Sequence, residues 1–568
     1  MIVGIDLGTT NSLVSVFRDD SFEVIPNSLG DFLTPSVVGL DDEGQVLTGA
    51  AAKERLLTHP ELTAANFKRL MGSSSEIKLG KKKFRPEELS SFILRALRLD
   101  AEAFLGDQVE EAIITVPAYF NDSQRKATKI AGELAGIRVA RLLNEPTSAA
   151  LAYGLHHEKE CRYLVFDLGG GTFDVSIVEY FDQLVEVHAS AGNNFLGGED
   201  FTEVIYQHFA RLCAQVLGRD AEALPPVLDK MLKFRAEQAK LLLSTQDQAA
   251  LQQKWHDQVI DLTVTQDQFE NWAGELVMKI ETPIRQALRD SKMRAGDLDE
   301  IVLVGGATRM PLIRKLVTRL FRRFPSVQID ADKVVAAGAA IQTGLMQKHA
   351  ALEDVVMTDV SPYTLGVEIS RQVGDRYADG HFMPIIERNS FIPVSRVETV
   401  CTVSDYQPKI EVRIYQGENP MVKDNIFLGS LTVDVPRKKR GEEEIDIRFT
   451  YDINGLLEVE VEVKSTGKKS SILIEENPGV LSKEEIASRF KQLEKLKIHP
   501  RDQIPNQALI NKANRLYQEN LGATRDYISE LLANFDAILS RQDEREIREA
   551  REQLGEILNQ IEEDPLAQ

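Results

Sequence analysis

The 568-residue sequence predicts an α/β domain, followed by an antiparallel β domain and a C-terminal helical bundle. Three successive hydrophobic patterns support this order. Up to about Leu352, short β-rich runs alternate with amphipathic helical stretches, which is typical of an α/β fold. Apolar and polar residues then alternate from Ser361 to Ile474, and a helical period begins at Leu481.

The N-terminal region contains several candidate strands and helices. Residues 112–116, 163–167 and 301–304 are short apolar runs, which predict buried strands. An amphipathic pattern around residues 269–288 predicts one long helix. Because such strands and helices alternate along the chain, we expect a sheet covered by helices.

The middle region has the period-two alternation of half-buried strands. Ile410, Val412 and Ile414 alternate with charged residues, and the same pattern returns at 445–449 and 457–463. Asn454–Gly455 lies between the last two runs and predicts a tight hairpin, because both residues tolerate positive φ. The region therefore predicts a compact antiparallel β domain.

The C-terminal region has the signals of helices. Ser482 and Glu485 have the spacing of a capping box, which predicts a helix start. Apolar residues then follow a helical period, which predicts core positions of a small bundle: Ile528, Leu531, Phe535, Ile538, Leu539, Ile547, Leu554, Ile557 and Ile561.

The composition excludes several classes of protein. The chain has 67 basic and 88 acidic residues, a net charge of −21, which argues against nonspecific binding to nucleic acid or anionic lipid. The three cysteines are far apart and predict neither a disulfide framework nor a zinc site. His156 and His157 near Cys161 fit a polar surface turn better than a metal site, because tetrahedral ligand spacing is missing.

The sequence also predicts where the protein acts in the cell. The chain begins directly with the strand-like run 2–6, without the charged and apolar regions of a signal peptide. It contains no apolar run long enough to span a bilayer. We therefore expect a soluble, cytoplasmic protein without a membrane partner.

The most informative feature is a repeated loop. In residues 5–10 (IDLGTT) and 166–174 (FDLGGGTFD), an apolar strand ends in Asp and a Gly/Thr turn leads into a second strand. Glycine lets backbone N–H groups approach an anionic phosphate, and a carboxylate beside it suits Mg²⁺. One such turn could be an ordinary hairpin, but two matching copies predict two similar lobes that hold one nucleotide. The chain has no GxxxxGK[ST] loop of the Walker type.

Three further segments accompany the repeated loop. Residues 304–311 (VGGATRMP) follow a strand and offer glycine backbone and Arg309 as a wall for a flat ligand. Residues 146–154 and 334–340 are rich in small side chains, which allow two helices to cross at close range. We expect this crossing to form a hinge between the two lobes.

These motifs resemble the actin–hexokinase–DnaK superfamily and, within it, the DnaK-type 70-kDa heat-shock chaperones. The resemblance covers essentially the whole chain and rests on GIDLGTTNS (4–12), ITVPAYF (114–120), NEPTSAALAYG (144–154), DLGGGTFD (167–174), LGGEDF (196–201) and VGGATRMP (304–311). The short C-terminal region and the stretch 385–399 make the closest match the HscC-like bacterial branch.

The resemblance implies a domain layout and a function. It implies a two-lobed actin-like (ribonuclease H-like) ATPase domain at 1–351, an interdomain linker at 352–360, a β-sandwich peptide-binding domain at 361–478 and a helical lid at 479–568. ATP binding and hydrolysis in the first domain would control the binding and release of extended apolar client peptides by the second. The cofactors would be ATP or ADP and Mg²⁺, with K⁺ also compatible.

The resemblance also assigns residues to the ATPase site. Asp6 and Asp167 would hold Mg²⁺, mostly through waters. Lys68, Thr172, Glu145 and Asp174 would be catalytic, with Lys68 beside the γ-phosphate and the two acids orienting or deprotonating water. The remaining nucleotide contacts would be Gly8, Thr9, Thr10, Asn11, Gly169, Gly170, Gly171, Gly197, Gly198, Glu237, Lys240, Ser244, Gly305, Gly306, Arg309 and Asp332. Taken alone, Lys68 could be a surface lysine, and Glu237 with Lys240 an ordinary helix pair.

Further residues match the family's coupling and substrate positions. Pro117 and Arg125 match a relay between ATPase site and linker, and Arg141, Asn144, Thr147 and Asp359 match the surface that meets a J-domain cochaperone. Residues 352–359 could be a docking strand or the start of the β domain, and Val355 and Val356 would carry the docking. The peptide cleft would use Val367, Ile369, Ser370, Val400, Val403, Ile410 and Val412, although some of these could belong to the sandwich core.

Two alternatives share the two-lobed ATPase fold. A sugar or metabolite kinase would have no use for a β domain and a helical bundle, and an actin-like filament protein lacks them. Ser370 and Val403 differ from the larger Met and smaller Ala of many relatives, so the peptide preference stays open. The client proteins, the J-domain partner and the nucleotide exchange factor also stay open.

Overall fold

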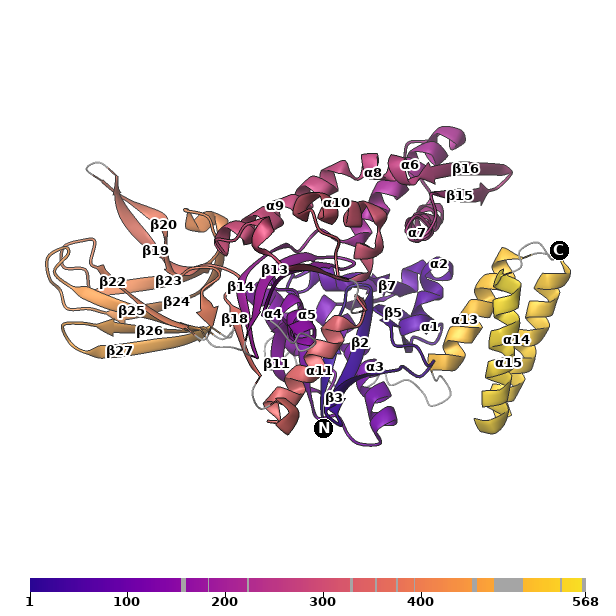
Figure 1. Ribbon diagram of the computed structural model, residues 1–568, viewed down its shortest axis with the longest axis horizontal. Helices are drawn as coiled ribbons and strands as arrows, with labels where there is room; N and C mark the ends of the chain where they lie inside the picture. The colour runs from indigo at the N-terminus through magenta and orange to yellow at the C-terminus, as the bar shows by residue number, and fades with distance from the viewer. Residues whose placement is uncertain are drawn as a thin grey trace.

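The computed structural model describes all residues except 155–159, 182, 222–223, 327–329, 353–354, 374–375, 393, 452–456, 475–503, 521, 542–543 and 564–568. The proposed hairpin at Asn454–Gly455, the capping box at Ser482 and Glu485, and His156 and His157 lie outside the described residues. The chain forms a central α/β body with the β domain on one side and the C-terminal helices on the other (Figure 1).

The N-terminal half of the α/β body is built on a mixed sheet. Its strands run in the order β11-β10-β1-β2-β3, with β1 and β10 parallel and β1 and β2 antiparallel. Buried apolar residues cover both faces of β1, as expected for a strand covered on both sides: Ile2 points to one face, and Val3 and Ile5 point to the other. The strands are β1 (Ile2–Asp6), β2 (Asn11–Arg18), β3 (Ser21–Ile25), β10 (Glu111–Val116) and β11 (Arg138–Asn144).

A second sheet repeats this arrangement. Its order is β17-β12-β13-β14-β18-β21, with β12 parallel to β17 and antiparallel to β13. The hairpin β12–β13 therefore corresponds to the hairpin β1–β2, which confirms that the two motif copies lie in similar settings. The strands are β12 (Cys161–Leu168), β13 (Phe173–Phe181), β14 (Leu184–Asn193), β17 (Glu300–Val304), β18 (Val356–Val360) and β21 (Phe391–Ile392).

Two small-residue helices cross between the sheets, as the sequence predicts. They are α5 (Glu145–Gly154) and α11 (Val334–Met346). A Cβ on Gly338 would lie 1.7 Å from the carbonyl oxygen of Ser148, so only glycine allows this approach. The Ser148 hydroxyl donates to the Val335 carbonyl at 2.7 Å, and Ser15 of β2 donates to Ala336 at 2.6 Å. Helix α11 thus contacts both α5 and the first sheet.

The long helix predicted at 269–288 is wrong in its start and continuity. The structure has α8 (Gln266–Trp272) and α9 (Gly274–Asp290), separated at Ala273, which leaves the helical region with φ −82° and ψ 3°. Gly274 follows directly, and glycine is the weakest helix former apart from proline. The apolar period continues through both helices, which is why the sequence pattern looked unbroken.

The remaining elements of the α/β body surround these sheets and helices. Lobe I, the part built on the first sheet, also contains β4 (Thr34–Pro35), β5 (Val37–Leu40), β6 (Val46–Thr48), α1 (Gly49–Lys53), α2 (Arg55–Thr58), β7 (Thr63–Ala65), the 3₁₀ helix η2 (Phe67–Leu70), β8 (Ile77–Leu79), β9 (Lys82–Phe84), α3 (Pro86–Leu105) and α4 (Asp122–Leu134). Lobe II, built on the second sheet, adds α6 (Gly198–Leu217), α7 (Pro226–Leu242), β15 (Gln248–Trp255), β16 (Gln258–Thr265) and α10 (Pro311–Phe321).

The middle region forms two four-stranded antiparallel sheets. Their orders are β20-β19-β23-β24 and β22-β25-β26-β27, and one apolar core including Ile414 and Phe449 joins them. The first sheet consists of β19 (Leu365–Val373), β20 (Arg376–Ile386), β23 (Lys409–Gln416) and β24 (Ile426–Asp434). The second consists of β22 (Val394–Cys401), β25 (Glu444–Tyr451), β26 (Leu457–Val463) and β27 (Lys468–Ile474).

The C-terminal helices pack on lobe I. They are α13 (Ile504–Glu519), α14 (Ala523–Arg541) and α15 (Glu544–Glu563), and their core includes the predicted Ile528, Phe535 and Leu554. Asn511 of α13 donates to the Ala51 carbonyl at 2.5 Å, and Arg515 pairs with Glu54 at 2.9 Å. The bundle therefore lies on the opposite side of the α/β body from the β domain (Figure 1). Within the described residues, no helix is long and apolar enough to cross a membrane.

Candidate functional site

The two repeated loops meet face to face between the lobes. The first follows β1 and the second follows β12, and each connects a strand that contains Asp near its end to an antiparallel partner. A Cβ on Gly170 would lie 1.9 Å from the Thr10 hydroxyl oxygen, and one on Gly171 would lie 2.9 Å from Thr9. Glycine is therefore required here because backbone from one lobe approaches side chains from the other.

Local hydrogen bonds hold each loop in shape. In the first loop, the Gly8 N–H donates to the Ser12 hydroxyl at 3.1 Å, and Ser36 donates to the Gly8 carbonyl at 2.8 Å. In the second, the N–H of Gly198 at the start of α6 donates to the Gly169 carbonyl at 2.9 Å. The loops are consequently preorganised by the chain itself.

The loops border a cleft with a volume of about 350 Å³. Most of the predicted nucleotide and metal residues line it, whereas Gly171, Gly197 and Asp174 lie outside its wall. The predicted residues on the wall are Asp6, Gly8, Thr9, Thr10, Asn11, Lys68, Glu145, Asp167, Gly169, Gly170, Thr172, Gly198, Glu237, Lys240, Ser244, Gly305, Gly306, Arg309 and Asp332.

Lys68 and Glu145 form a buried ion pair at one end of the cleft. The Lys68 ammonium lies 2.7 Å from a Glu145 carboxylate oxygen, and the Lys68 residue is only 3% exposed. This burial excludes the alternative of an ordinary surface lysine. The ammonium also lies 5.5 Å from the centre of the Phe120 ring, within the range of a cation–π contact.

Acidic side chains crowd around this pair. Burial, with the nearby Glu145 charge, raises the pKa of Asp6 to about 7, although Lys68 and the Thr115 hydroxyl act in the opposite direction. Burial and the charge of Glu145 also raise the pKa of Asp167 well above its ordinary value. The Thr115 hydroxyl donates to Asp6 at 2.9 Å. Several carboxylates thus compete for few positive charges in one buried region.

Asp174 lies behind the cleft wall. It is opposite Asp167 in the β12–β13 pairing, and the Tyr119 N–H donates to its Oδ1 at 3.3 Å. Its Oδ2 is buried and has no hydrogen-bond partner within the described part of the chain. Burial, followed by the charge of Glu145, raises the pKa of Asp174 to about 8.

This cluster fits a hydrated divalent cation bound together with phosphates. Among the described residues, no three His, Cys, Asp or Glu side chains converge closely enough to hold a metal by themselves. Mg²⁺ typically keeps several waters and uses one or two carboxylates plus substrate phosphates. Asp6 and Asp167 lie on the cleft wall and are the residues that could supply these carboxylates. A cation there would also offset the burial and the Glu145 charge that raise the pKa values of both aspartates.

The opposite end of the cleft offers polar groups from lobe II. Lys240 is buried, donates to the Gly198 carbonyl at 2.9 Å and lies 2.7 Å from Glu237, which also accepts a hydrogen bond from Thr202. Glu237 and Lys240 therefore form the ordinary helix pair and also line the cleft. Arg309 pairs with Asp332 and lies 3.4 Å from Asp330, half-exposed at the cleft edge. Ser244 completes this side.

A hydrogen-bond chain joins the cleft to the segment before the β domain. Asn144 directly precedes Glu145, and its amide donates to the Asp359 carboxylate at 2.9 Å. Thr147 donates to the same oxygen at 3.1 Å, and Arg125 donates to Asn144 at 2.6 Å. Burial raises the pKa of Asp359, whereas the Val360 N–H and the charge of Arg141 act against this.

The expected linker is a strand of the second sheet. Val356, Met357 and Thr358 of β18 pair in parallel with residues 184–186 of β14, so the docking-strand alternative fits this structure. Val355 packs partly against the core, but Val356 is 56% exposed. Val355 and Val356 are neighbours, so their side chains point to opposite faces of the segment. Val356 therefore contributes to this strand through its backbone pairing with Leu184, whereas the side chain of Val360, which is 1% exposed, is better anchored. That both valines carry the docking stays a prediction.

The seven predicted peptide residues do not share one environment. Val367 and Val412 are buried in the core between the two β sheets, as the alternative reading allows. Ile369, Val400 and Ile410 are partly buried against that core, whereas Ser370 donates to Asp379 at 2.5 Å and Val403 is 38% exposed. The structure therefore brings some of these residues to the surface and others into the interior.

Sequence patterns missed several residues of the site. Tyr119 holds Asp174, and Phe120 and Thr115 contact Lys68 and Asp6. These three residues lie in the 114–120 segment, which carried the family resemblance but was given no role in the site beyond Pro117. Arg69, next to Lys68, binds Asp200 of α6 with oxygen distances of 3.1 and 3.2 Å. No local pattern predicts that pair, because the two residues lie in different lobes.

Comparison with known proteins covers almost the whole chain. A family model described as Hsp70 protein matches residues 2–567. The chain is 42% identical over 485 residues to the chaperone protein DnaK of Thermotoga neapolitana, which covers 83% of this chain and 80% of that relative. It is 40% identical over 526 residues to the chaperone protein DnaK of Thermosipho africanus, covering 91% and 86% respectively. This chain therefore belongs to the Hsp70 family.

Proposed function

We propose that this chain is an ATP-driven molecular chaperone. In this proposal, the bound nucleotide controls how tightly the β domain binds extended apolar peptides. One observation carries this proposal beyond family membership. Glu145 pairs with Lys68 in the cleft and directly follows Asn144 in the chain. The Asn144 side chain binds Asp359, which lies in the strand that leads to the β domain. A change at the cleft therefore has a short covalent and hydrogen-bonded route to the second domain.

In this proposal the α/β body is a two-lobed, actin-like ATPase domain covering residues 1–351. The paired loops hold the phosphates through backbone N–H groups and the hydroxyls of Thr9, Thr10 and Thr172. Lys68 stabilises the charge that develops on the transferred phosphoryl group, and Glu145 and Asp174 orient or deprotonate the attacking water. Asp6 and Asp167 hold Mg²⁺ largely through waters, and the ion neutralises phosphate charge when it is bound. A requirement for K⁺ stays a prediction.

The lobe II residues are proposed to bind the adenosine part. Glu237, Lys240 and Ser244 form one wall, and Gly305, Gly306 and Arg309 form the other. Gly305 has φ 84° and passes close to the Leu168 carbonyl, where a Cβ would lie 2.4 Å away. This close passage brings the glycine backbone beside the phosphate loop and leaves room for a flat ring.

The remaining segments complete the proposed cycle. Residues 352–360 act as the linker, 361–478 as the peptide-binding β sandwich and 479–568 as the helical lid. The lid's described helices lie on lobe I, so we propose that this arrangement is the open state. Extended peptides would add backbone hydrogen bonds and place an apolar side chain near the partly buried Ile410. A J-domain cochaperone would contact Arg141, Asn144, Thr147 and Asp359. The protein would act in the cytoplasm. Its placement in the HscC-like branch stays a prediction.

The proposal is tested by measuring release of a fluorescent apolar peptide from the full chain with ATP, with ADP and without nucleotide. We expect ATP to accelerate release strongly relative to ADP. The variant Lys68→Met should slow single-turnover hydrolysis by about 100-fold or more, the usual effect of losing an electrostatic catalyst, while ATP still triggers release. The surface variant Lys83→Met, at a side chain 64% exposed, should behave like the parent. Equal peptide release rates with ATP and ADP would contradict the proposal.

A further inference from the structure

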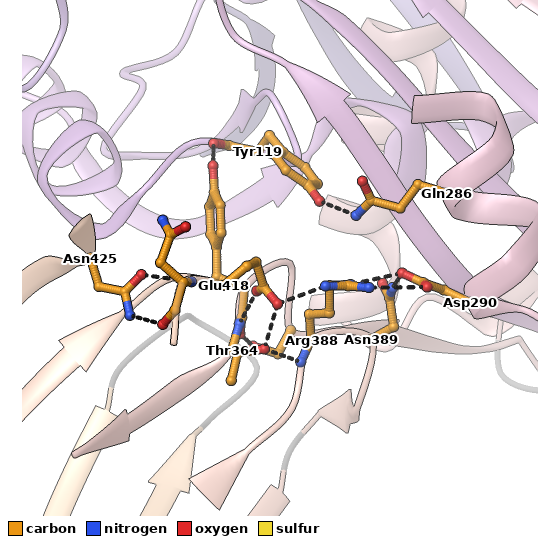
Figure 2. Close-up of polar contacts among 11 residues, drawn as sticks. Tyr119, Gln286, Asp290, Thr364, Arg388, Asn389, Glu418 and Asn425 are labelled. Carbon is orange, nitrogen blue, oxygen red and sulfur yellow. Dashed lines mark hydrogen bonds and ion pairs between the residues drawn. The ribbon is translucent and has the colours of Figure 1, made fainter. Parts of the chain in front are cut away.

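Tyr119 is held from several sides at the junction of both lobes and the β domain. Its hydroxyl accepts a hydrogen bond from Gln286 of α9 at 3.0 Å (Figure 2). Its carbonyl accepts from the Asn194 amide at 2.6 Å, and its N–H donates to Asp174 at 3.3 Å. The position of this one peptide segment thus depends on lobe II through three different side chains.

The β domain adds one more contact to the same segment. Tyr363 lies just after β18, and its hydroxyl donates to the Tyr119 carbonyl at 2.5 Å. The two rings also pack together, with centroids 4.9 Å apart. Next to this contact, Arg388 binds Asp290 of α9 and Glu418, and Glu418 also accepts from the N–H and hydroxyl of Thr364 (Figure 2). Thr364, the residue after Tyr363, is therefore held by Glu418, and Tyr363 itself is held by Tyr119.

The Tyr119 segment also touches the candidate hydrolytic residues. Its N–H binds Asp174, and the next ring, Phe120, lies beside the Lys68 ammonium. On the other side, Arg125 donates to the carbonyls of Ala118 and Phe120 at 3.1 and 3.0 Å. Any displacement of this turn therefore moves Asp174 relative to Lys68 and Glu145.

We propose that Tyr363 is a positioning residue for ATP hydrolysis: its hydroxyl, by holding the Tyr119 carbonyl, sets the Asp174 carboxylate in place when the β domain is docked. This inference rests on the proposed function, because it assumes that the cleft hydrolyses ATP. Tyr363 does not line the cleft, and neither does Asp174. The contact therefore acts on the chemical step and leaves nucleotide binding unchanged.

The decisive variant is Tyr363→Phe in the full chain, which removes one oxygen and keeps the ring that packs on Tyr119. Loss of one hydrogen bond predicts single-turnover hydrolysis slower by roughly three- to tenfold, with an unchanged dissociation constant for ATP. The matched control is Tyr406→Phe, because Tyr406 lies in the same domain and is 61% exposed. That control should hydrolyse ATP at the parental rate.

Two further variants separate positioning from docking in general. Arg388→Ala removes one contact of the same interface but leaves the Tyr363–Tyr119 and Asn389–Asp290 hydrogen bonds in place, so it should leave the single-turnover rate within about twofold of the parent. In an Asp174→Asn background, Tyr363→Phe should have no further effect on hydrolysis, because the residue through which it acts is already changed. The circular dichroism spectrum of each variant should match that of the parent chain, which excludes misfolding as the cause of any loss.

Three outcomes would overturn the inference. They are a Tyr363→Phe rate equal to the parent, an equal loss in Arg388→Ala, or an undiminished effect in the Asp174→Asn background. A weaker affinity for ATP would count against it as well. Absence of hydrolysis by the parent chain itself would be a different result, because it would refute the proposed function and not the placement of Tyr363.

Discussion

The buried carboxyl groups around the cleft differ from surface acids because the fold has separated them from water. Asp174 shows this most clearly: its Oδ1 has a backbone donor, its Oδ2 has no partner among the described residues, and its pKa rises to about 8. An unfolded Asp titrates near 3.8. The folded nucleotide-free chain therefore binds more protons than the unfolded chain between these two values, and its stability falls as pH rises through that window.

We expect Asp174→Asn to remove the contribution of this residue to the pH dependence. At pH 5 the side chain of the parent is protonated and neutral, so the two proteins should melt at similar temperatures. At pH 8.5 the parent carries a buried charge that the variant lacks, and the variant should melt several degrees higher. The measurement is a series of melting curves of the nucleotide-free chain in magnesium-free buffers between pH 5 and 9.

The control for this prediction is Asp257→Asn in the exposed β15–β16 turn, where the melting difference should not change with pH. A constant difference between the Asp174→Asn variant and the parent across the whole range would contradict the raised pKa. A variant that becomes relatively less stable at high pH would contradict its sign.

Among individual residues, the sequence predicts those whose role follows from their neighbours along the chain. Gly170, Thr10 and Asp167 follow from strand–turn patterns, and the structure places them together on one cleft. Tyr119 and Arg69 could not be found this way, because their partners are distant in sequence and a tyrosine or arginine has many ordinary surface roles. Val367 and Val403 also end in different environments. Val367 is buried in β19, whereas Val403 lies in the loop between β22 and β23, where no strand pattern predicts which way a side chain faces.

The crossing of α5 and α11 is the element on which the separation of the lobes depends. Gly338 brings the helices together, and α11 simultaneously packs on β1, where a Cβ on Gly4 would lie 2.5 Å from Ala339. The small-residue pattern of both segments predicts this packing from sequence. The break between α8 and α9 was missed because hydrophobic periodicity does not register the backbone at Ala273.

Gly338→Ala tests this crossing. The added methyl group would overlap the Ser148 backbone, so the helices must separate, at a cost of about 1–3 kcal/mol or more. We expect a lower melting temperature and weaker ATP binding, because the displaced helices carry Glu145 and Val335 at the cleft. Calorimetric titration with ATP and thermal melting measure the two effects.

The matched control is Gly274→Ala, at a helical glycine with open space around its Cβ position. Alanine favours helix there by up to about 1 kcal/mol, so this variant should be as stable as the parent or slightly more stable. If both glycine variants lost the same stability, close approach at Gly338 would not be the reason for its effect.

At the scale of the whole molecule, individual polar contacts join the two lobes. Arg69 of lobe I and Asp200 of lobe II form such a contact directly beside the phosphate loops, and Asp200 also accepts from the Gly197 N–H at 2.7 Å. Lys230 of α7 adds a second bridge by donating to the Pro60 carbonyl at 3.0 Å. If a bound nucleotide leaves when the lobes part, these contacts should slow its release.

Arg69→Ala should therefore accelerate ADP dissociation by roughly two- to fivefold, the range expected for a partly exposed ion pair. The ADP release rate is measured by displacement of a fluorescent analogue in stopped flow. High salt should shrink the difference between variant and parent, because screening already weakens the pair in the parent. Arg285→Ala, which removes a surface pair within α9, serves as the control and should leave release unchanged.

Docking of the β domain depends on a second contact between distant parts of the chain. Arg388 binds both oxygens of Asp290, at 2.8 and 3.2 Å, and Asn389 donates to the same carboxylate at 3.0 Å. These hydrogen bonds are charge-assisted and partly shielded from water, so each stabilises the docked arrangement more than an exposed ion pair would. They join α9 of lobe II to the loop that precedes β21.

If docking drives peptide release, Arg388→Ala and Asp290→Ala should each slow ATP-triggered release, by roughly tenfold for the loss of a charged hydrogen-bonded contact. The double variant should be no slower than the slower single variant, because both changes break one interaction. Arg448→Ala, in the other β sheet at a side chain 50% exposed, should release peptide like the parent. Additive effects of the two substitutions would mean that Arg388 and Asp290 act through separate partners, with Glu418 the first to test because it binds Arg388 at 2.7 Å.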